Sequence, residues 1–160
     1  MNMAMSERDK TAARHAAAVV LLVIYLAVLL YLLFLSDRYG RTEGFTEYHY
    51  NLIPFAEIRR YISYRSSFNT ELFLVNIVGN VLAFAPFGFL LPLAYRRVAV
   101  FWQVTLLGFL FSLLVETMQL LLMVGTFDVD DLILNVTGVM IGYGLSMLFR
   151  RAKKPDGWGA

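Results

Sequence analysis

The run AAAVVLLVIYLAVLLYLLFL occupies residues 16–35 and contains no charged side chain. A run of about 20 apolar residues is what an α-helix needs to cross the hydrocarbon core of a bilayer. Arg8, Lys10 and Arg14 precede it, as basic residues precede the apolar core of a signal peptide. That core, however, is only about 7–15 residues long and is followed by a small-residue cleavage site. We therefore expect a membrane helix that is retained in the protein.

Three further apolar runs follow, at residues 72–94, 98–124 and 132–149. The chain of 160 residues is 59% hydrophobic and 16% charged, whereas soluble domains carry about 25% charged residues. These features predict an all-α fold, an integral membrane bundle of four transmembrane helices over residues 16–149, without a second domain. The net charge of +2 gives no indication of nucleic-acid binding. The absence of cysteine excludes disulfides, thiol catalysis and thiolate metal sites.

Basic residues near the helix ends predict the orientation of the bundle, because lysine and arginine gather on the cytoplasmic side of a membrane. With four spans, the segment 1–15, the hairpin holding Arg96 and Arg97, and the basic tail 150–160 all fall on one side. We expect this side to be the cytoplasm, with both termini inside the cell membrane. The other side receives residues 36–71, whose five basic and five acidic residues balance, and the loop 125–131, which has three aspartates and no basic residue.

The long outer loop contains a stretch, residues 55–65, in which apolar or aromatic residues recur at Phe55, Ile58, Tyr61 and Ile62 among charged ones. This spacing predicts a short helix lying on the membrane surface. Pro54 would stand at or just before its first turn, where proline is tolerated. An ordinary connector that packs on the bundle is the other interpretation, and the two are not exclusive.

Polar side chains lie within or beside three of the apolar runs, where they tend to mark a functional site or an interhelical contact. Counting about 1.5 Å per residue from the outer surface puts Asn80 and Glu116 roughly 12 Å deep and Asn135 roughly 5 Å deep. Small residues such as Gly138 and Gly142 accompany them and let helix backbones approach closely. We therefore expect these polar faces to meet each other and not lipid. The candidates for this polar centre are Asn76, Asn80, Glu116, Gln119, Asp128, Asp131 and Asn135.

Each polar group also has a purely structural interpretation. The amides can simply hydrogen-bond one helix to another. Asp128, with Asp131 three residues later, fits a helix N-cap, while Asp130 is expected to point elsewhere, into solvent. Glu116 is the hardest to explain structurally, because a carboxyl several turns deep is protonated, paired or in contact with a wet cavity.

No catalytic or metal-binding template is completed by the sequence. The two histidines, His15 and His49, fall on opposite sides of the membrane in this topology. Glu116, Asp128 and Asp131, with His49 as a further candidate, could bind a hard metal ion or serve as acid and base. Because this signal depends on the spacing between different helices, no catalytic residue is assigned, and neither a metal nor another cofactor is predicted.

Five motifs occur in order within residues 48–146. They are NLIPF at 51–55, NIVGN at 76–80, FAPFG at 84–88, ETMQ at 116–119, and FDVDD at 127–131 followed by Asn135 and Gly138. Together they resemble the VanZ-like family, and Asn51 joins the candidates for the polar centre. The resemblance implies a small multi-helix membrane protein of the bacterial cell envelope. The family's namesake accompanies glycopeptide-resistance clusters and is associated with teicoplanin resistance, but the resemblance implies no catalytic residue.

Three functions fit these observations, and we favour the first. It is a non-enzymatic envelope protein that lowers sensitivity to lipoglycopeptides such as teicoplanin at the outer leaflet, or that binds a lipid-linked wall component. The second is an intramembrane enzyme that acts on a lipid or lipid-linked substrate through Glu116 with Asp128 and Asp131. The third is a proton-coupled carrier, which four helices would form only as an oligomer. The expected partners are membrane lipids and a lipid-linked cell-wall precursor or lipoglycopeptide, with the oligomeric state left open.

Overall fold

The computed structural model describes residues 7–35, 47–56, 59, 70–95 and 97–152. Within these residues the chain forms long helices joined at one end by a pair of short strands. The helices are α1 (Glu7–Phe34), α3 (Thr70–Ala94), α4 (Phe101–Leu121) and α5 (Val129–Ala152), and the strands are β1 (Tyr50–Asn51) and β2 (Phe127–Asp128). Each helix contains a segment long and apolar enough to cross a membrane, namely Arg8–Phe34, Asn76–Ala94, Phe101–Leu121 and Val129–Ala152. The predicted all-α bundle of four membrane helices is therefore confirmed.

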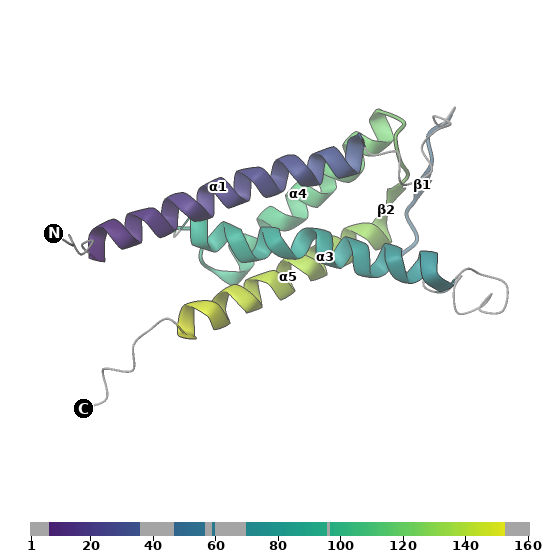
Figure 1. The fold of residues 1–160 in the computed structure, drawn as a ribbon. Helices are drawn as coiled ribbons and strands as arrows, with labels where there is room; N and C mark the ends of the chain where they lie inside the picture. Colours follow the sequence, from purple (N-terminus) through teal and green to yellow (C-terminus); the bar gives the residue numbers. More distant parts are fainter. Residues whose placement is uncertain (1–6, 36–46, 57–58, 60–69, 96, 153–160) are drawn as a thin grey trace.

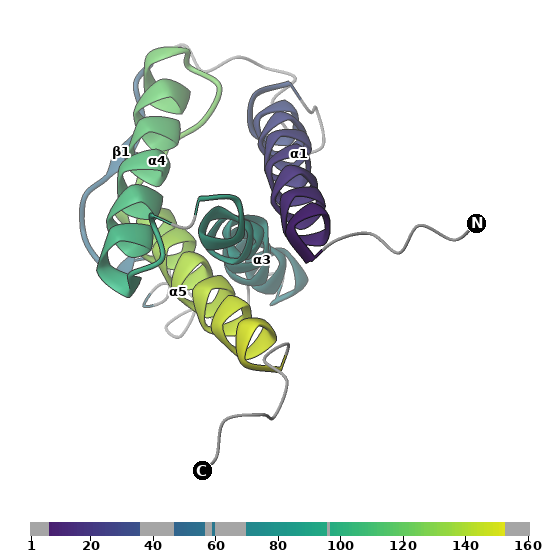
Figure 2. The ribbon, with the colours of Figure 1, turned by 90° about the vertical axis from the view of Figure 1, so that its left-hand side faces the viewer.

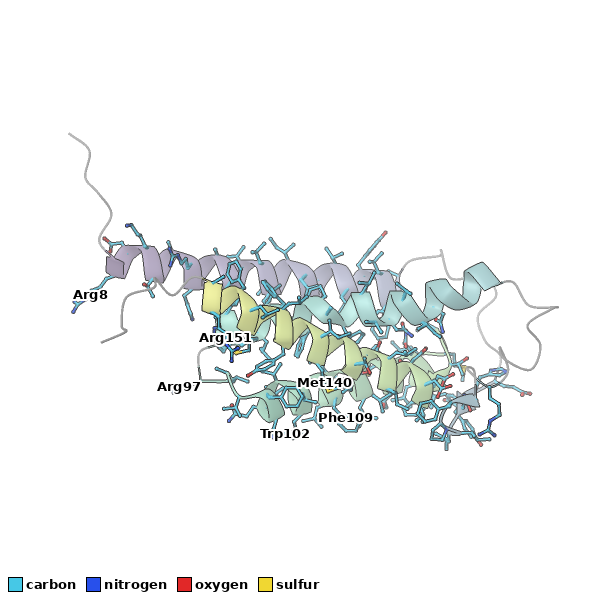
Figure 3. All side chains as sticks on the ribbon, turned by 90° about the horizontal axis from the view of Figure 1, so that it is seen from below. Arg8, Arg97, Trp102, Phe109, Met140 and Arg151 are labelled. Carbon is cyan, nitrogen blue, oxygen red and sulfur yellow. The ribbon has the colours of Figure 1, made fainter. Side chains whose placement is uncertain are left out.

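The helices alternate in direction along the bundle. Figure 1 shows the start of α1, the connection between α3 and α4, and the end of α5 at one end of the molecule, with β1 and β2 at the other. Arg8, Arg97 and Arg151 all lie at the first of these ends (Figure 3). We call it the basic end, and the end that holds β1 and β2 the strand end. The predicted orientation requires these three basic segments to lie on the same side of the membrane.

The helix limits differ from the predicted ones: α1 begins at Glu7, nine residues before the predicted residue 16, and α4 is shorter than its apolar run. The apolar run suggested residues 98–124, but the helix extends only over Phe101–Leu121. At its start Val98 belongs to a turn, since its N–H donates to the Tyr95 carbonyl at 2.9 Å. At its end Met123 has a φ of 53°, and the Val124 N–H donates to the Gln119 carbonyl at 3.0 Å, which closes the helix in a Schellman-type turn. Because these turn residues are apolar, hydropathy could not separate them from the helix.

α3 is the central helix of the bundle. It lies between α1 and α5 in Figure 2, and its most extensive contacts are with α5. Two glycines of α5 allow this approach: a methyl group at Gly138 would meet the backbone carbonyl of Val81, and one at Gly142 would meet that of Ala85. The predicted role of these small residues in close helix packing is confirmed.

The outer faces of the helices are apolar, and so is the core between them. Phe84, Val104 and Val139 are fully buried where α3, α4 and α5 meet, whereas Trp102 and Leu148 are 74% and 62% exposed. Large exposed apolar side chains are distributed along all four helices. A surface of this kind is unfavourable in water and is suited to contact with lipid tails.

The surface helix predicted at residues 55–65 falls mostly outside the described residues. Phe55, Ala56 and Arg59 are the described members of that stretch. The Arg59 N–H donates to the Phe55 carbonyl at 2.9 Å, which is the bond of one helical turn. The prediction of a longer helix there stays a prediction.

Candidate functional site

The two short strands fasten the segment before them to the start of α5. β1 pairs with β2 in parallel so that Asn51 aligns with Asp128, and the Phe127 N–H donates to the His49 carbonyl at 3.1 Å. The Asn51 amide nitrogen lies 3.2 and 3.3 Å from the two carboxylate oxygens of Asp128. The Asn51 oxygen accepts the Ile53 N–H at 3.2 Å. A neutral amide, held in position by its own turn, is thus a direct partner of Asp128.

Asp128 caps the N-terminus of α5, as the sequence predicted. One of its carboxylate oxygens accepts the Asp130 N–H at 2.8 Å, which is a usual N-cap bond. In an ordinary capping box, the acid at the third helical position, here Asp131, would accept the N–H of the cap residue. That N–H donates instead to the Glu116 carboxylate of α4 at 3.2 Å. Glu116 therefore completes the cap from a neighbouring helix, and Asp131 is available for other contacts.

Asp131 joins α5 to α3 through two asparagines. One of its carboxylate oxygens accepts a hydrogen bond from the Asn80 amide at 2.6 Å and a longer one from the Asn76 amide at 3.4 Å. The two asparagines are four residues apart on α3, so both side chains reach the same point. The expectation that these polar faces meet each other is confirmed for α3 and α5.

Asn135 and Gln119 connect further pairs of helices. The Asn135 amide nitrogen donates to the Ser112 hydroxyl of α4 at 2.9 Å, and the Gln119 amide donates to the Leu33 carbonyl of α1 at 3.3 Å. The carbonyl oxygen of the Asn135 side chain is buried and has no hydrogen-bond partner. A buried acceptor in that state is costly, so a ligand that brings a donor to this atom would be favoured.

A cavity of about 270 Å³ lies among these groups. Two carboxyls and four amides line it, together with apolar side chains from α1, α3 and α4 and with the loop 124–126. The predicted residues that line it are Asn76, Asn80, Glu116, Gln119, Asp131 and Asn135. Asn51 and Asp128 are not among its described lining residues; they hold the start of α5, which carries Asp131. His49 is exposed and is likewise not among the lining residues.

The cavity borders the surface that faces lipid. It is lined by both α1 and α4, which stand apart in Figure 2 and are not among the extensively packed helix pairs. Leu32 of α1 lines the cavity and is 42% exposed. Other large apolar side chains of α1, such as Val28 and Tyr31, are also exposed, so the cavity adjoins the exposed apolar surface of α1.

The lining determines which chemistry the cavity supports. Among the described residues, its ionisable members are Glu116 and Asp131, and no basic side chain lines it. Carboxyls and amides together donate and accept hydrogen bonds, so they suit hydroxyl, amide or ammonium groups, and a carboxyl can also exchange a proton with such a group. In the part of the chain that the structure describes, no three His, Cys, Asp or Glu side chains are grouped so that they could hold a metal ion.

The position of the Asp130 side chain contradicts the prediction made from the sequence. It was expected to point into solvent, but it is only 3% exposed and accepts a hydrogen bond from the Phe55 N–H. Phe55 itself has a φ of 61°, which is uncommon for a bulky residue. The helical position of Asp130 indicates the direction of its side chain. It does not show that the backbone at Phe55, in another loop, contacts that side chain.

Two parts of the cavity wall were missed by sequence reasoning. Leu29, Leu32 and Leu33 of α1 line it, and apolar side chains within a membrane helix carry no signal of what they face. Thr126 also lines it. Its position directly before the FDVDD motif is the signal that could have identified it.

Comparison with known proteins identifies the family of this chain. The model of the family described as VanZ/LLP1 matches residues 22–150, well over half of the chain. Protein VanZ of Enterococcus faecium is 29% identical to the chain over 142 residues, which cover 85% of this chain and 79% of that protein. No solved structure matches the chain. The matched residues extend from within α1 into α5 and include every residue that lines the cavity. This chain is a multi-pass membrane protein and belongs to the VanZ/LLP1 family.

Proposed function

We propose that this protein binds a lipid-linked wall component or a lipid-tailed glycopeptide at the outer leaflet of the bacterial cell membrane, and thereby lowers sensitivity to lipoglycopeptides such as teicoplanin. The observation that carries this proposal is the polar cavity beside the bilayer. Its carboxyls and amides match a hydroxyl- and amide-rich headgroup. The apolar surface next to Leu32 matches the lipid tail of the same molecule.

The distribution of charge supports an outer location for the cavity. At the basic end, the described residues include Arg8, Arg14, Arg97, Arg150 and Arg151. On the other side, residues 36–71 contain five basic and five acidic residues, and the loop 124–128 contains one aspartate and no basic residue. Because basic residues gather on the cytoplasmic side, this asymmetry favours a cytoplasmic basic end and an outward strand end, with both termini inside.

The family relationship supports the choice of ligand. The VanZ-like resemblance implies an envelope protein associated with teicoplanin resistance, and the similarity to Protein VanZ covers most of both chains. Teicoplanin carries a lipid tail and vancomycin does not. A protein that works beside the outer leaflet should therefore distinguish the two drugs.

Intramembrane catalysis on a lipid-linked substrate is the second candidate. Glu116 and Asp131 come from different helices and line the same cavity, as an acid and a base in one active site would. Both carboxyls, however, already accept hydrogen bonds from the protein: Glu116 from the Asp128 backbone and Asp131 from Asn80. These bonds favour a positioning and binding role, so we prefer the non-enzymatic proposal.

Drug susceptibility tests this proposal. A sensitive Gram-positive host would express wild type, Glu116→Gln or Glu47→Gln at matched membrane levels. We expect wild type to raise the inhibitory concentration of teicoplanin at least fourfold more than that of vancomycin. Glu116→Gln keeps an acceptor for the Asp128 N–H but removes the carboxyl, so we expect it to abolish most of the shift. Glu47 is exposed outside the cavity, and its variant should behave as wild type.

Two results would count against the proposal. Equal shifts in the inhibitory concentrations of both drugs would show that the lipid tail of teicoplanin is not recognised. A full teicoplanin shift with Glu116→Gln would show that the cavity carboxyl is not used.

A further inference from the structure

A second cavity, of about 450 Å³, lies at the basic end, where α1, α3 and α5 come together. The basic residue types in its lining are Arg14 and His15 of α1 and Arg150 of α5. No acidic side chain is among its described lining residues, in contrast to the cavity at the strand end. The remaining wall includes Leu21, Phe89, Leu90, Leu93 and Phe149. Basic and apolar side chains together make the lining of this cavity amphipathic.

Arg150 is held in a fixed position. One of its terminal nitrogens donates to the Pro92 carbonyl at 2.8 Å, in the last turn of α3 before Ala94. A guanidinium has five N–H donors in a rigid fork, so this bond orients the group and leaves donors for another acceptor. Such a preoriented fork suits a phosphate oxygen.

An apolar groove of about 360 Å³ continues from the basic cavity along α3. The two share Phe89 and Leu90, and the groove extends to Leu82 with Leu145 of α5 on its other side. From Leu93 to Leu82, α3 rises about 16 Å at 1.5 Å per residue. That is about half of the 30 Å hydrocarbon core, or one leaflet. The groove therefore has the position and length of an acyl chain whose headgroup lies at the basic end.

We propose that the basic cavity and the adjoining groove bind an anionic glycerophospholipid, with its phosphate between Arg14 and Arg150 and an acyl chain along α3. Basic pockets between membrane helices recognise anionic headgroups by the same combination of charge and apolar wall. The bound lipid would join α1 to α5, two helices that both pack mainly on α3. This inference does not depend on the function proposed for the cavity at the strand end.

Lipid binding by the purified full chain tests the inference. Native mass spectrometry in a mild detergent would count bound lipids during titration with dioleoyl phosphatidylglycerol or dioleoyl phosphatidylcholine. We expect one retained phosphatidylglycerol and at least tenfold weaker retention of phosphatidylcholine. Arg14→Gln removes one charged contact and should weaken phosphatidylglycerol binding about fivefold, while Arg14→Lys should restore it to within twofold.

The controls separate this site from nonspecific attraction. Arg97 and Arg151 are exposed at the same end and are not among the lining residues, so Arg97→Gln and Arg151→Gln should leave the affinity within twofold. Arg150→Gln should weaken binding but also removes the bond to Pro92, so Arg14→Gln is the deciding variant. A tenfold excess of sn-glycerol 1-phosphate should not displace the lipid.

Three outcomes would overturn the inference. The first is equal retention of the two phospholipids. The second is an equal loss of affinity with Arg14→Gln and Arg97→Gln, which would indicate a diffuse charge effect. The third is displacement by sn-glycerol 1-phosphate, which would indicate a phosphate site without an acyl groove.

Discussion

At the scale of the residue, three acids at the strand end accept hydrogen bonds from neutral donors. Glu116 accepts a backbone N–H, Asp131 accepts two asparagine amides, and Asp128 accepts the Asn51 amide. Neutral partners position a carboxyl without cancelling its charge, whereas an arginine would do both. The cavity at the strand end therefore keeps an acidic character that a bound ligand can use.

The two asparagines that reach Asp131 should contribute unequally. Asn80 lies at 2.6 Å and Asn76 at 3.4 Å from the same oxygen. We expect Asn80→Ala to lower the free energy of unfolding by about 1–2 kcal/mol, since it leaves the partly buried Asp131 carboxyl with a poor partner. Asn76→Ala should cost less than about 0.5 kcal/mol. Unfolding in mixed micelles would measure both, and equal losses would contradict this ranking of the two bonds.

At the scale of the element, the sequence predicted the number and order of the membrane helices but not all of their ends. Long apolar runs identify spans because only a helix satisfies its backbone in lipid. The same runs hide apolar turns such as those at Val98 and Met123. The capping of α5 was predicted from Asp128, but not the exchange by which Glu116 accepts the cap N–H. That bond joins α5 to α4, and no pattern of neighbouring residues in the sequence predicts it.

The contact between α3 and α5 predicts a difference between two nearby glycines. A methyl group at Gly142 would collide with the Ala85 carbonyl, whereas nothing lies within 4 Å of one at Gly144. Gly142→Ala should therefore separate the helices and lower the free energy of unfolding by more than about 2 kcal/mol. Gly144→Ala should raise it by about 0.5–1 kcal/mol through helix propensity. Thermal unfolding in detergent would compare the two, and a stable Gly142→Ala protein would contradict the backbone contact.

At the scale of the whole molecule, two cavities of opposite character lie at opposite ends of the bundle. The strand-end cavity is lined by carboxyls and amides, and the basic-end cavity by Arg14, His15 and Arg150. Six of the eight residues proposed from the sequence line the first cavity, because stripes of polar residues on membrane helices converge when the helices pack. The α1 wall could not be predicted, since packing against α3 decides which leucines face inward.

The orientation of the molecule can be tested through the absence of cysteine. Single cysteines would replace Tyr48 at the strand end or Arg97 at the basic end, both of which are exposed. In intact Gram-positive cells, we expect a membrane-impermeant maleimide to label Tyr48→Cys and to label Arg97→Cys only after permeabilisation. The reverse labelling pattern would show that the strand end faces the cytoplasm, and the acidic cavity would then lie in the cytoplasmic leaflet.

The central claim is that the polar cavity at the strand end is the functional site, and filling it tests that claim most directly. Gly79 lines the cavity, and nothing lies within 4 Å of a methyl group added there. A β-carbon at Gly79 therefore meets no neighbour, and we expect the longer side chain of Gly79→Leu to extend into the cavity. Leucine also favours a helix over glycine by about 0.8 kcal/mol. Gly144→Leu is the matched control, since its added side chain meets open space away from the cavity.

Teicoplanin susceptibility of cells expressing either variant at wild-type membrane levels is the decisive measurement. We predict that Gly79→Leu loses the teicoplanin shift while its thermal stability is unchanged or higher, and that Gly144→Leu retains the shift. A Gly79→Leu protein that retains the full shift would contradict the account, because the cavity would be filled while the function persisted.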